Sequence, residues 1–306
     1  RLDEPDSFRS AVAAADVALY EAVFNMMESL VPEYDHAGVV RERTGGALPG
    51  IVPSNTYTTQ EGANIVIAAK TAEPDPRLPG TIYTAAEDIE AVGGRALPLQ
   101  VDIRDAEAVA AAVAKAAEHF GGIDILVNNA SAIGITRTTE TPAKRYDLMM
   151  DINMRGTFVC SQACIPHLKR AANPHILVLS PPINLNPKWL GAHPAYTASK
   201  YGMSLLALGM AEELRHDGIA VNCLWPKTII ATSALKVAQA GLGDMGRLPQ
   251  IMADAAHDIL SSPSRGRTGN AFIDEDVLRA RGVTDFSPYL VTPGVTPIID
   301  LFLDVE

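Results

Sequence analysis

From Ala63 onward the chain alternates short apolar segments with longer segments of helical periodicity, and this alternation limits the fold more than any other feature. The expected strands are Asn64–Ala69, Ala96–Val101, Ile123–Val127, His175–Leu179, Ile219–Trp225 and Ala271–Asp274. The expected helices lie between them, at about 85–92, 105–120, 155–171, 196–217 and 251–260. Strands that are joined through helices run parallel and are covered on both faces. The sequence therefore predicts an α/β fold with a doubly wound parallel sheet.

The composition excludes several classes of function. The formal net charge of -11 argues against binding to nucleic acid or to an anionic membrane surface. No run of about 18 apolar residues occurs, so no membrane span is expected. The three cysteines, Cys160, Cys164 and Cys223, show no metal-binding spacing, and no metal site is predicted. Few and unpaired cysteines indicate reduced thiols and a cytoplasmic protein.

Tyr196 and Lys200 lie four residues apart at the start of an expected helix, so their side chains share one helix face. An ammonium beside a phenol favours the phenolate and lowers the pKa of the tyrosine toward working pH. Tyr196 is therefore a candidate general acid and base for an alcohol or a carbonyl. The same spacing also occurs in solvated surface pairs, so the pair alone does not establish a site.

Five informative features follow the expected strands at the points where the strands end. They are Lys70, Asp102, Asn128–Ser131, Ser180 and Pro226. Taken singly, each has a structural explanation as a helix cap, a turn residue or a solvated side chain. Ligands of open parallel sheets bind at the carboxyl ends of the strands. Their shared placement therefore predicts a nucleotide-type binding site.

Residues 63–306 resemble the short-chain dehydrogenase/reductase family, within its hydroxysteroid dehydrogenase-like branch. The family motifs present are Asp102-Ile103, Asn128-Asn129-Ala130-Ser131, Asn153, Tyr196 with Lys200, and Val221-Asn222 leading to Pro226. The branch is indicated by Ile67-Ala68-Ala69-Lys70, Ser180-Pro181-Pro182, Leu224-Trp225-Pro226-Lys227 and the segment 269–275. The resemblance implies a Rossmann-like fold and hydride transfer between NAD(P)(H) and a small molecule, taken to be a lipid-like alcohol or ketone.

The resemblance also implies a role for each matching residue. Tyr196 would exchange a proton with the substrate oxygen, and Lys200 would lower the pKa of Tyr196 and bind the nicotinamide ribose. Asn153 would hold a water in the proton relay. The implied catalytic set is Tyr196, Lys200, Asn153 and Ser180. The implied cofactor-binding set is Lys70, Asp102, Ile103, Asn129, Ala130, Ser131, Tyr196, Lys200 and Pro226.

Further expectations concern the cofactor and the assembly. Lys70 ends the strand where an acidic residue would favour NAD, and a cation there suits the 2′-phosphate of NADP(H). The family resemblance predicts a homo-oligomer formed through the helices at 155–171 and 196–215. An apolar helix face can equally be core, so the sequence leaves that assembly open.

The chain departs from the family pattern at three places. Ser180 stands further from Tyr196 than the family's catalytic serine does, and a longer loop here would place the serine position at Pro181. Lys227 replaces the usual glycine after Pro226. The glycine-rich turn that would bind the pyrophosphate, and the first strand before it, are apparently missing, because 44–50 matches the motif poorly.

Residues 1–62 instead resemble a piece of a class III CoA-transferase, through 16–22 and 48–57. This predicts a hybrid chain with an N-terminal segment at 1–62 and a dehydrogenase domain at 63–306. Either 51–57 is recruited as the missing strand, or the sheet closes up with one strand fewer; a helix at 17–30 would cover the exposed face. The alternatives to an active dehydrogenase are an impaired hybrid without a pyrophosphate loop and, with less support, a CoA-transferase.

Overall fold

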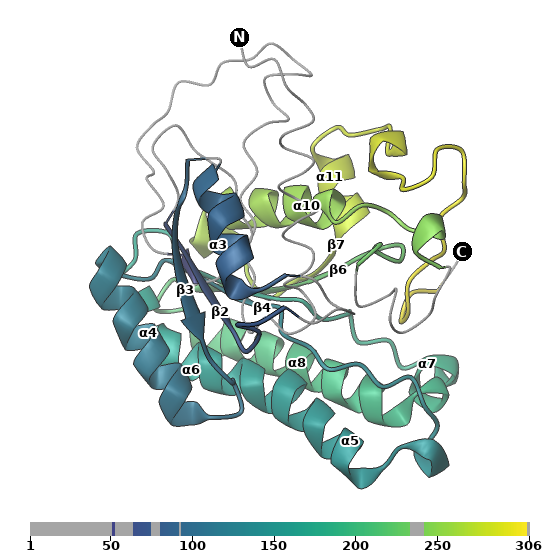
Figure 1. The fold of residues 1–306 in the computed structure, drawn as a ribbon. Coiled ribbons are helices and arrows are strands. Elements are labelled where there is room, and N and C mark those ends of the chain that lie inside the picture. Colours follow the sequence, from purple (N-terminus) through teal and green to yellow (C-terminus); the bar gives the residue numbers. More distant parts are fainter. Residues whose placement is uncertain (1–50, 53–63, 75–79, 92, 233–241, 305–306) are drawn as a thin grey trace.

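A computed structural model of the protein describes residues 51–52, 64–74, 80–91, 93–232 and 242–304. The described strands form one parallel sheet of seven, in the order β3-β2-β1-β4-β5-β6-β7 (Figure 1). The strands are β1 (Ile51–Val52), β2 (Asn64–Ala69), β3 (Arg95–Gln100), β4 (Ile125–Asn128), β5 (His175–Val178), β6 (Ala220–Trp225) and β7 (Ala271–Ile273). The predicted doubly wound, Rossmann-like α/β fold is confirmed.

Helices cover both faces of the sheet (Figure 1). One face carries α4 (Ala106–Phe120), α6 (Thr157–Leu168) and α8 (Pro194–Glu213), which share the largest apolar core with the strands. The other face carries α3 (Ile82–Ala91) against β2, and α10 (Gln250–Ser261) with α11 (Asp274–Ala280) against β4–β6. Shorter elements are α5 (Ala143–Met149), η3 (Met150–Gly156), α7 (Pro187–Ala192), η2 (Thr138–Glu140), η4 (Gly243–Met245), η5 (Ser264–Gly266) and η6 (Ser287–Tyr289).

Helix α4 shows how local sequence sets an element. The Asp105 carboxylate caps its N-terminus by accepting hydrogen bonds from the backbone N–H groups of residues 107 and 108. Gly121 ends the helix at φ 87°, a left-handed conformation that glycine adopts without steric cost. Val109 and Val113 face the sheet and are fully buried.

The first strand comes from upstream of the predicted join. Ile51 pairs with Ile65 of β2 and with Ile125 of β4, and Val52 pairs with Leu126. The two-residue strand β1 therefore occupies the position predicted to be missing, and the expectation of a sheet with one strand fewer is wrong. Recruitment fits the cost of the alternative, because a gap would leave backbone groups of β2 and β4 unpaired. The stretch 44–50, which matches the glycine motif poorly, and the helix expected at 17–30 lie outside the described residues.

Two stretches differ from the sequence-based expectation. The helix expected from residue 155 is preceded by α5 and by a π-helical turn, η3, which carries Asn153. Residues after 280, for which the sequence predicts no strand or helix, pack onto the body of the protein. In this segment Ile299 pairs with Thr228, and Phe302 is 1% exposed.

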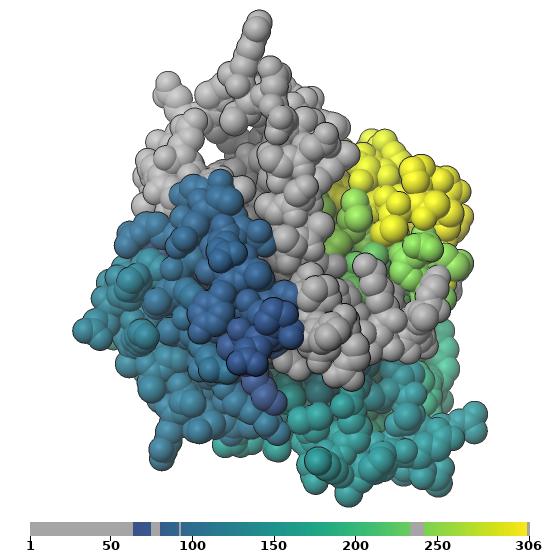
Figure 2. All heavy atoms as spheres, viewed as in Figure 1, coloured from purple at the N-terminus to yellow at the C-terminus, as the bar shows by residue number. Residues whose placement is uncertain are grey.

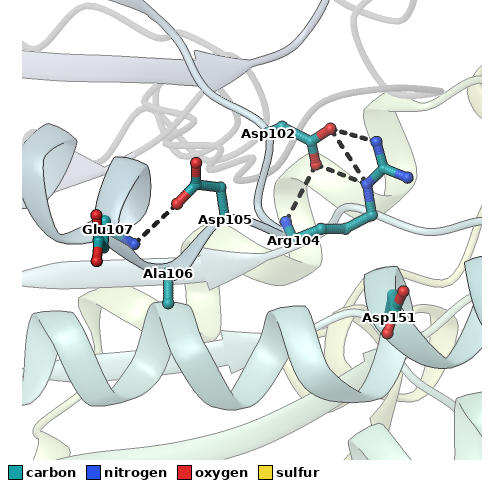
Figure 3. Close-up of a pocket in the computed structure, with 6 residues that line it drawn as sticks. All are labelled: Asp102, Arg104, Asp105, Ala106, Glu107 and Asp151. Atoms are coloured by element: carbon teal, nitrogen blue, oxygen red, sulfur yellow. Dashed lines mark hydrogen bonds and ion pairs between the residues drawn. The ribbon is translucent and has the colours of Figure 1, made fainter.

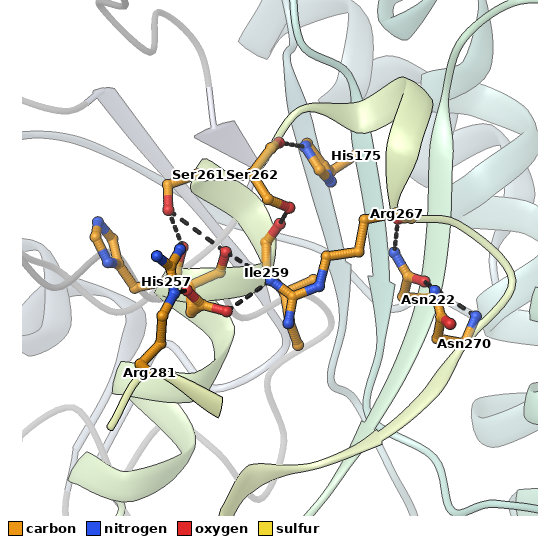
Figure 4. Close-up of polar contacts among 10 residues, drawn as sticks. His175, Asn222, His257, Ile259, Ser261, Ser262, Arg267, Asn270 and Arg281 are labelled. Atoms are coloured by element: carbon orange, nitrogen blue, oxygen red, sulfur yellow. Dashed lines mark hydrogen bonds and ion pairs between the residues drawn. The ribbon is translucent and has the colours of Figure 1, made fainter. Parts of the chain in front are cut away.

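Polar contacts near the amino end of β5 hold the segment after α10 in place (Figure 4). There the His175 ring bonds the carbonyl of Ser262, and Asn222 bonds the carbonyl of Arg267. Arg267 also pairs with Asp258 at 2.6 Å. Burial lowers the pKa of His175 to about 4, so the ring is neutral at physiological pH. These groups lie away from the carboxyl ends of the strands and stabilise the fold.

In a space-filling view the elements from β2 to α4 and the C-terminal residues occupy opposite sides of the visible face (Figure 2).

Cys160, Cys164 and Cys223 are buried and free of disulfide bonds. Among the described residues, every helix is too short or too polar to cross a membrane.

Candidate active site

A cavity of about 210 Å³ opens at the carboxyl ends of β4, β5 and β6. Its polar lining includes Asn129, Ser131, Tyr196 and Lys200. Its apolar lining is larger and includes Val127, Ile133, Leu177, Leu179, Leu224, Trp225, Pro226, Ile230, Pro249, Met252 and Ala256. The structure thus brings residues from three predicted strand ends and the Tyr196 helix into one space.

Tyr196 and Lys200 lie one turn apart on α8, and both are almost completely buried. The solvated-pair interpretation is therefore wrong. The expected lowering of the Tyr196 pKa is not observed either. Burial raises the pKa of this phenol, the charge of Asp300 raises it further, and the Ser131 hydroxyl lowers it.

Lys200 makes contacts of its own that explain this result. Its Nζ donates a hydrogen bond to the carbonyl of Leu179 at 2.6 Å and lies over the ring of Trp225 at 5.1 Å. Burial lowers the pKa of Lys200 to about 7, while the charge of Asp300 acts in the opposite direction. The ammonium is directed at the end of β5, so it stabilises a phenolate at Tyr196 less than the helix spacing predicts.

Asn153 sits in the π-helical turn η3 and is fully buried. Its Oδ1 accepts from the backbone N–H of Ala132 at 2.7 Å, and its Nδ2 donates to the Ala132 carbonyl and to Ser199 Oγ. Ser199 in turn donates to the carbonyl of Tyr196 at 2.8 Å. The side chain of Asn153 therefore joins the loop after β4 to α8, and its hold on a relay water stays a prediction.

Ser180 is placed differently from the other predicted catalytic residues. It is fully buried behind the end of β5, beside the Cys223 thiol of β6, and its Oγ makes no hydrogen bond of ordinary geometry. It is not among the residues that line the cavity. Its neighbour Pro181 carries no hydroxyl, so neither residue presents one to the cavity.

The Asn128–Ser131 segment serves two functions. Asn128 donates to Ser161 of α6 at 3.1 Å, and Ala130 belongs to the apolar core. Asn129 and Ser131 line the cavity. The Nδ2 of Asn129 is buried without a hydrogen-bond partner, although buried amide donors are almost always paired.

The predicted nucleotide end of the cleft lies at β2 and β3 (Figure 3). Lys70 is exposed just after β2, and its charge helps to lower the pKa of Asp102. The main cause of that lowering is Arg104, whose guanidinium bonds both Asp102 oxygens, at 2.9 and 2.5 Å. Ile103 is buried against Gly156 in the core, so only its backbone is available to a cofactor.

The described residues fit a nicotinamide cofactor. The orphan amide of Asn129 is a donor aimed at no protein acceptor, and it shares the cavity with Tyr196, Lys200 and Pro226. A carboxamide-bearing ring would supply the missing acceptor. Lys70 and Asp102 follow β2 and β3, on the far side of β1 from the cavity, where the adenosine half of a dinucleotide would lie.

The C-terminal residues pack against the cavity residues Tyr196 and Trp225, and no local motif in the sequence marks them. Phe302 packs against the rings of Tyr196, Tyr201 and Trp225, with centroids 6.2, 5.3 and 5.8 Å away. Its φ of 71° is strained for a residue with a side chain, and strain of this kind costs about 1–3 kcal/mol. Burial of the ring and a hydrogen bond from Asn184 to its carbonyl hold this conformation.

Asp300 and Asp304 flank that phenylalanine in contrasting surroundings. Burial raises the pKa of Asp300 to about 7, the charge of Asp274 raises it further, and Lys200 acts in the opposite direction. Asp304 is exposed, and its bond with Lys188, supported by Asn184, lowers its pKa to about 2. Of these two carboxyl groups, Asp300 is the one whose charge acts on Tyr196 and Lys200.

Comparison with known proteins agrees with this arrangement. The profile of the short chain dehydrogenase family matches residues 55–241. Hydroxysteroid dehydrogenase-like protein 2 of Danio rerio is 57% identical over 246 residues, covering 80% of this chain and 59% of the relative. The Homo sapiens protein of the same name is 56% identical, again over 80% of this chain and 58% of the relative. The chain thus spans about three-fifths of the length of the curated relatives it matches.

A crystal structure of a short chain dehydrogenase from Mycobacterium thermoresistibile superposes with a TM-score of 0.76 at 55% identity, covering 80% of this chain and 87% of that one. The CoA-transferase resemblance of residues 1–62 and the domain boundary at 62 stay predictions, and no activity is assigned to that segment. On the fold, the cavity residues and these matches, the chain belongs to the short-chain dehydrogenase/reductase family.

Proposed function

We propose that the protein is an NADP(H)-dependent oxidoreductase that interconverts an apolar, lipid-like alcohol and its ketone. The observation that carries this proposal is the pairing of Tyr196 and Lys200 in one cavity with the orphan amide of Asn129. A proton donor, a cation and an amide donor in an otherwise apolar space suit an uncharged carbonyl compound beside a nicotinamide.

In this proposal the bound nicotinamide supplies the hydride chemistry. Tyr196 gives its phenolic proton to the carbonyl oxygen in reduction and takes it back in oxidation. Lys200 binds the ribose hydroxyls and, when charged, favours the phenolate. Asn129 orients the carboxamide. The surrounding apolar side chains exclude water from the reacting atoms.

The choice of NADP(H) rests on Lys70. Its side chain is exposed at the end of β2, whereas the neighbouring Arg104 is already bound to Asp102. The Lys70 ammonium can pair with the 2′-phosphate of NADP(H), a group that NAD(H) lacks.

A fluorescence titration of the purified protein with NADPH tests cofactor binding. Micromolar affinity is expected, and Lys70→Glu should weaken it about tenfold or more, because a cation in contact with the phosphate is replaced by an anion. The matched control is Lys115→Glu, an exposed lysine on α4, which should leave binding unchanged. Absence of binding at millimolar NADPH and NADH would favour the impaired hybrid instead.

A panel of alcohols and ketones of increasing chain length tests the substrate class. Because the lining is mostly apolar, each added methylene should lower KM by up to about fourfold until the cavity is filled. A preference for charged substrates over apolar ones would contradict the assignment of a lipid-like substrate.

Homo-oligomerisation through α6 and α8 is part of the same proposal. Phe158, Leu205 and Leu208 are 46%, 60% and 38% exposed on these adjacent helices, which is unusual for large apolar side chains unless a partner covers them. Light scattering on wild type and Leu205→Asp tests this assembly. A monomeric wild type would contradict it.

A further inference from the structure

Ser131 is a hydroxyl that lines the cavity and contacts the phenol of Tyr196. It follows the carboxyl end of β4 and shares the lining with Tyr196 and Lys200. Its interaction with Tyr196 is the one that lowers the pKa of the phenol against the effect of burial. A substrate oxygen that bonds Tyr196 would therefore lie within reach of Ser131 as well.

The loop that carries Ser131 is held rigidly against the catalytic helix. Asn153 bonds both backbone polar atoms of the next residue, Ala132, and also bonds Ser199. Ser199 bonds the carbonyl of Tyr196. This chain of buried hydrogen bonds fixes Ser131 relative to Tyr196, as a preorganised donor requires.

Ser180, which the family resemblance predicts to be catalytic, cannot reach the same atoms in this structure. It is fully buried outside the cavity lining and faces Cys223. Pro181, the alternative occupant of the serine position, has no hydroxyl. Neither residue at the end of β5 can therefore donate a second hydrogen bond, beside that of Tyr196, to the substrate oxygen.

We propose that Ser131 is the catalytic hydroxyl that donates a hydrogen bond to the substrate oxygen beside Tyr196. This inference rests on the proposed dehydrogenase function, because the oxygen concerned is the one that Tyr196 protonates. In reduction, the carbonyl carbon gains the hydride, the oxygen gains the proton of Tyr196, and Ser131 keeps its own proton. Its hydrogen bond strengthens as negative charge builds on the oxygen, which lowers the barrier.

The test compares Ser131→Ala, Ser131→Thr and Ser180→Ala in the full-length chain. With the best ketone of the panel, Ser131→Ala should lower kcat about 10²-fold, as loss of one oxyanion donor typically does. The NADPH dissociation constant should stay within about twofold of wild type, because the lost bond is to substrate. Ser131→Thr keeps the hydroxyl and should recover most of the rate. Ser180→Ala should remain close to wild type.

The pH dependence gives a second readout that a merely structural role would not move. Without the Ser131 hydrogen bond the pKa of Tyr196 rises. The rate of alcohol oxidation by Ser131→Ala should therefore begin to rise at a higher pH than that of wild type. The inference would be overturned if Ser131→Ala left kcat and the pH–rate profile unchanged, or if it weakened only NADPH affinity. It would also be overturned if Ser131→Ala and Ser131→Thr lowered kcat equally, or if Ser180→Ala lowered kcat as Ser131→Ala is expected to. A wild type that binds NADPH but reduces no ketone would overturn the proposed function, and the inference with it.

Discussion

At the cavity end of the cleft the candidate functional side chains are buried, whereas at the nucleotide end they are exposed. Tyr196 and Lys200 are 5% and 2% exposed, and their surroundings shift the pKa of both. Lys70 stands in solvent, and the Asp102–Arg104 pair is about one-third exposed. Electrostatic interactions are strong in the first environment and screened in the second.

This difference teaches which kinetic quantity each end controls. Buried groups that touch the reacting atoms change the barrier when they are altered, and so change kcat. Exposed groups that touch a remote part of the cofactor change its affinity and leave the barrier alone. Four variants test this division, three of them on residues that the sequence did not mark.

Tyr196→Phe should have the largest effect. It removes the phenolic proton and keeps the ring, so kcat should fall about 10³-fold while NADPH still binds. The control is Tyr201→Phe, on the same helix and in the same aromatic cluster, whose hydroxyl bonds the carbonyl of Asn184. It should lose less than about tenfold, because one neutral hydrogen bond contributes about 1 kcal/mol. Equal losses in steady-state assays of both would remove Tyr196 from the reaction.

Phe302→Ala should have the next largest effect, on stability. The ring is 1% exposed among aromatic side chains, and truncating a buried phenylalanine costs about 3–5 kcal/mol. Urea unfolding followed by circular dichroism measures this cost. Tyr83→Ala, on α3 of the nucleotide half and 49% exposed, is the control and should cost below about 1 kcal/mol. A small loss at Phe302 would mean that the C-terminal residues are not part of the cavity end.

How much of this contrast the sequence predicts depends on the range of the interactions. The strands, the caps of α4 and the Tyr196–Lys200 pair follow from periodicity and from residues at most four apart. The Tyr196 pKa does not, because burial and Asp300 outweigh the local ammonium. Phe302 and Asp300 lie about 100 residues from Tyr196. Only the fold brings them to the site.

The recruitment of Ile51–Val52 illustrates the same limit. The sequence predicted a vacant sheet position and offered two ways to resolve it, because strand pairing depends on neighbours distant in the chain. The pairing of Ile51 with both Ile65 and Ile125 decides between them. Ser180 failed as a cavity residue for a related reason: a motif position fixes the strand end but not the direction of the side chain.

Asp300→Asn should have a smaller effect than these two variants, on the pH dependence of alcohol oxidation. Removing this negative charge lowers the pKa of Tyr196, so the rising limb of alcohol oxidation should move about one unit to lower pH. The pKa of Asp300 is raised to about 7, so its ionisation destabilises the folded state progressively from about pH 4 to pH 7. Unfolding curves should therefore show Asp300→Asn gaining stability over wild type at pH 8 and not at pH 4.

The control for that variant lies in the same segment. Asp304→Asn changes an exposed carboxyl whose pKa is already lowered to about 2, so it is ionised throughout the assay range. Its pH–rate profile should match wild type. If both variants moved the limb equally, the effect would come from the net charge of the segment and not from contact with the buried pair.

Arg104→Ala should have the smallest effect and sharpens the comparison most directly. The guanidinium orients Asp102 and holds its pKa below the usual range, yet the pair is partly exposed and screened. Loss of Arg104 should weaken NADPH about two- to fivefold and leave kcat at saturating cofactor unchanged, because the adenosine end is remote from the reacting carbon. The matched control is Arg215→Ala, which breaks an exposed pair with Glu212 at the end of α8 and should alter neither quantity. The comparison requires that changes at the nucleotide end alter cofactor affinity alone. A fall in kcat in Arg104→Ala would contradict it, because it would show that the nucleotide end also positions the reacting atoms.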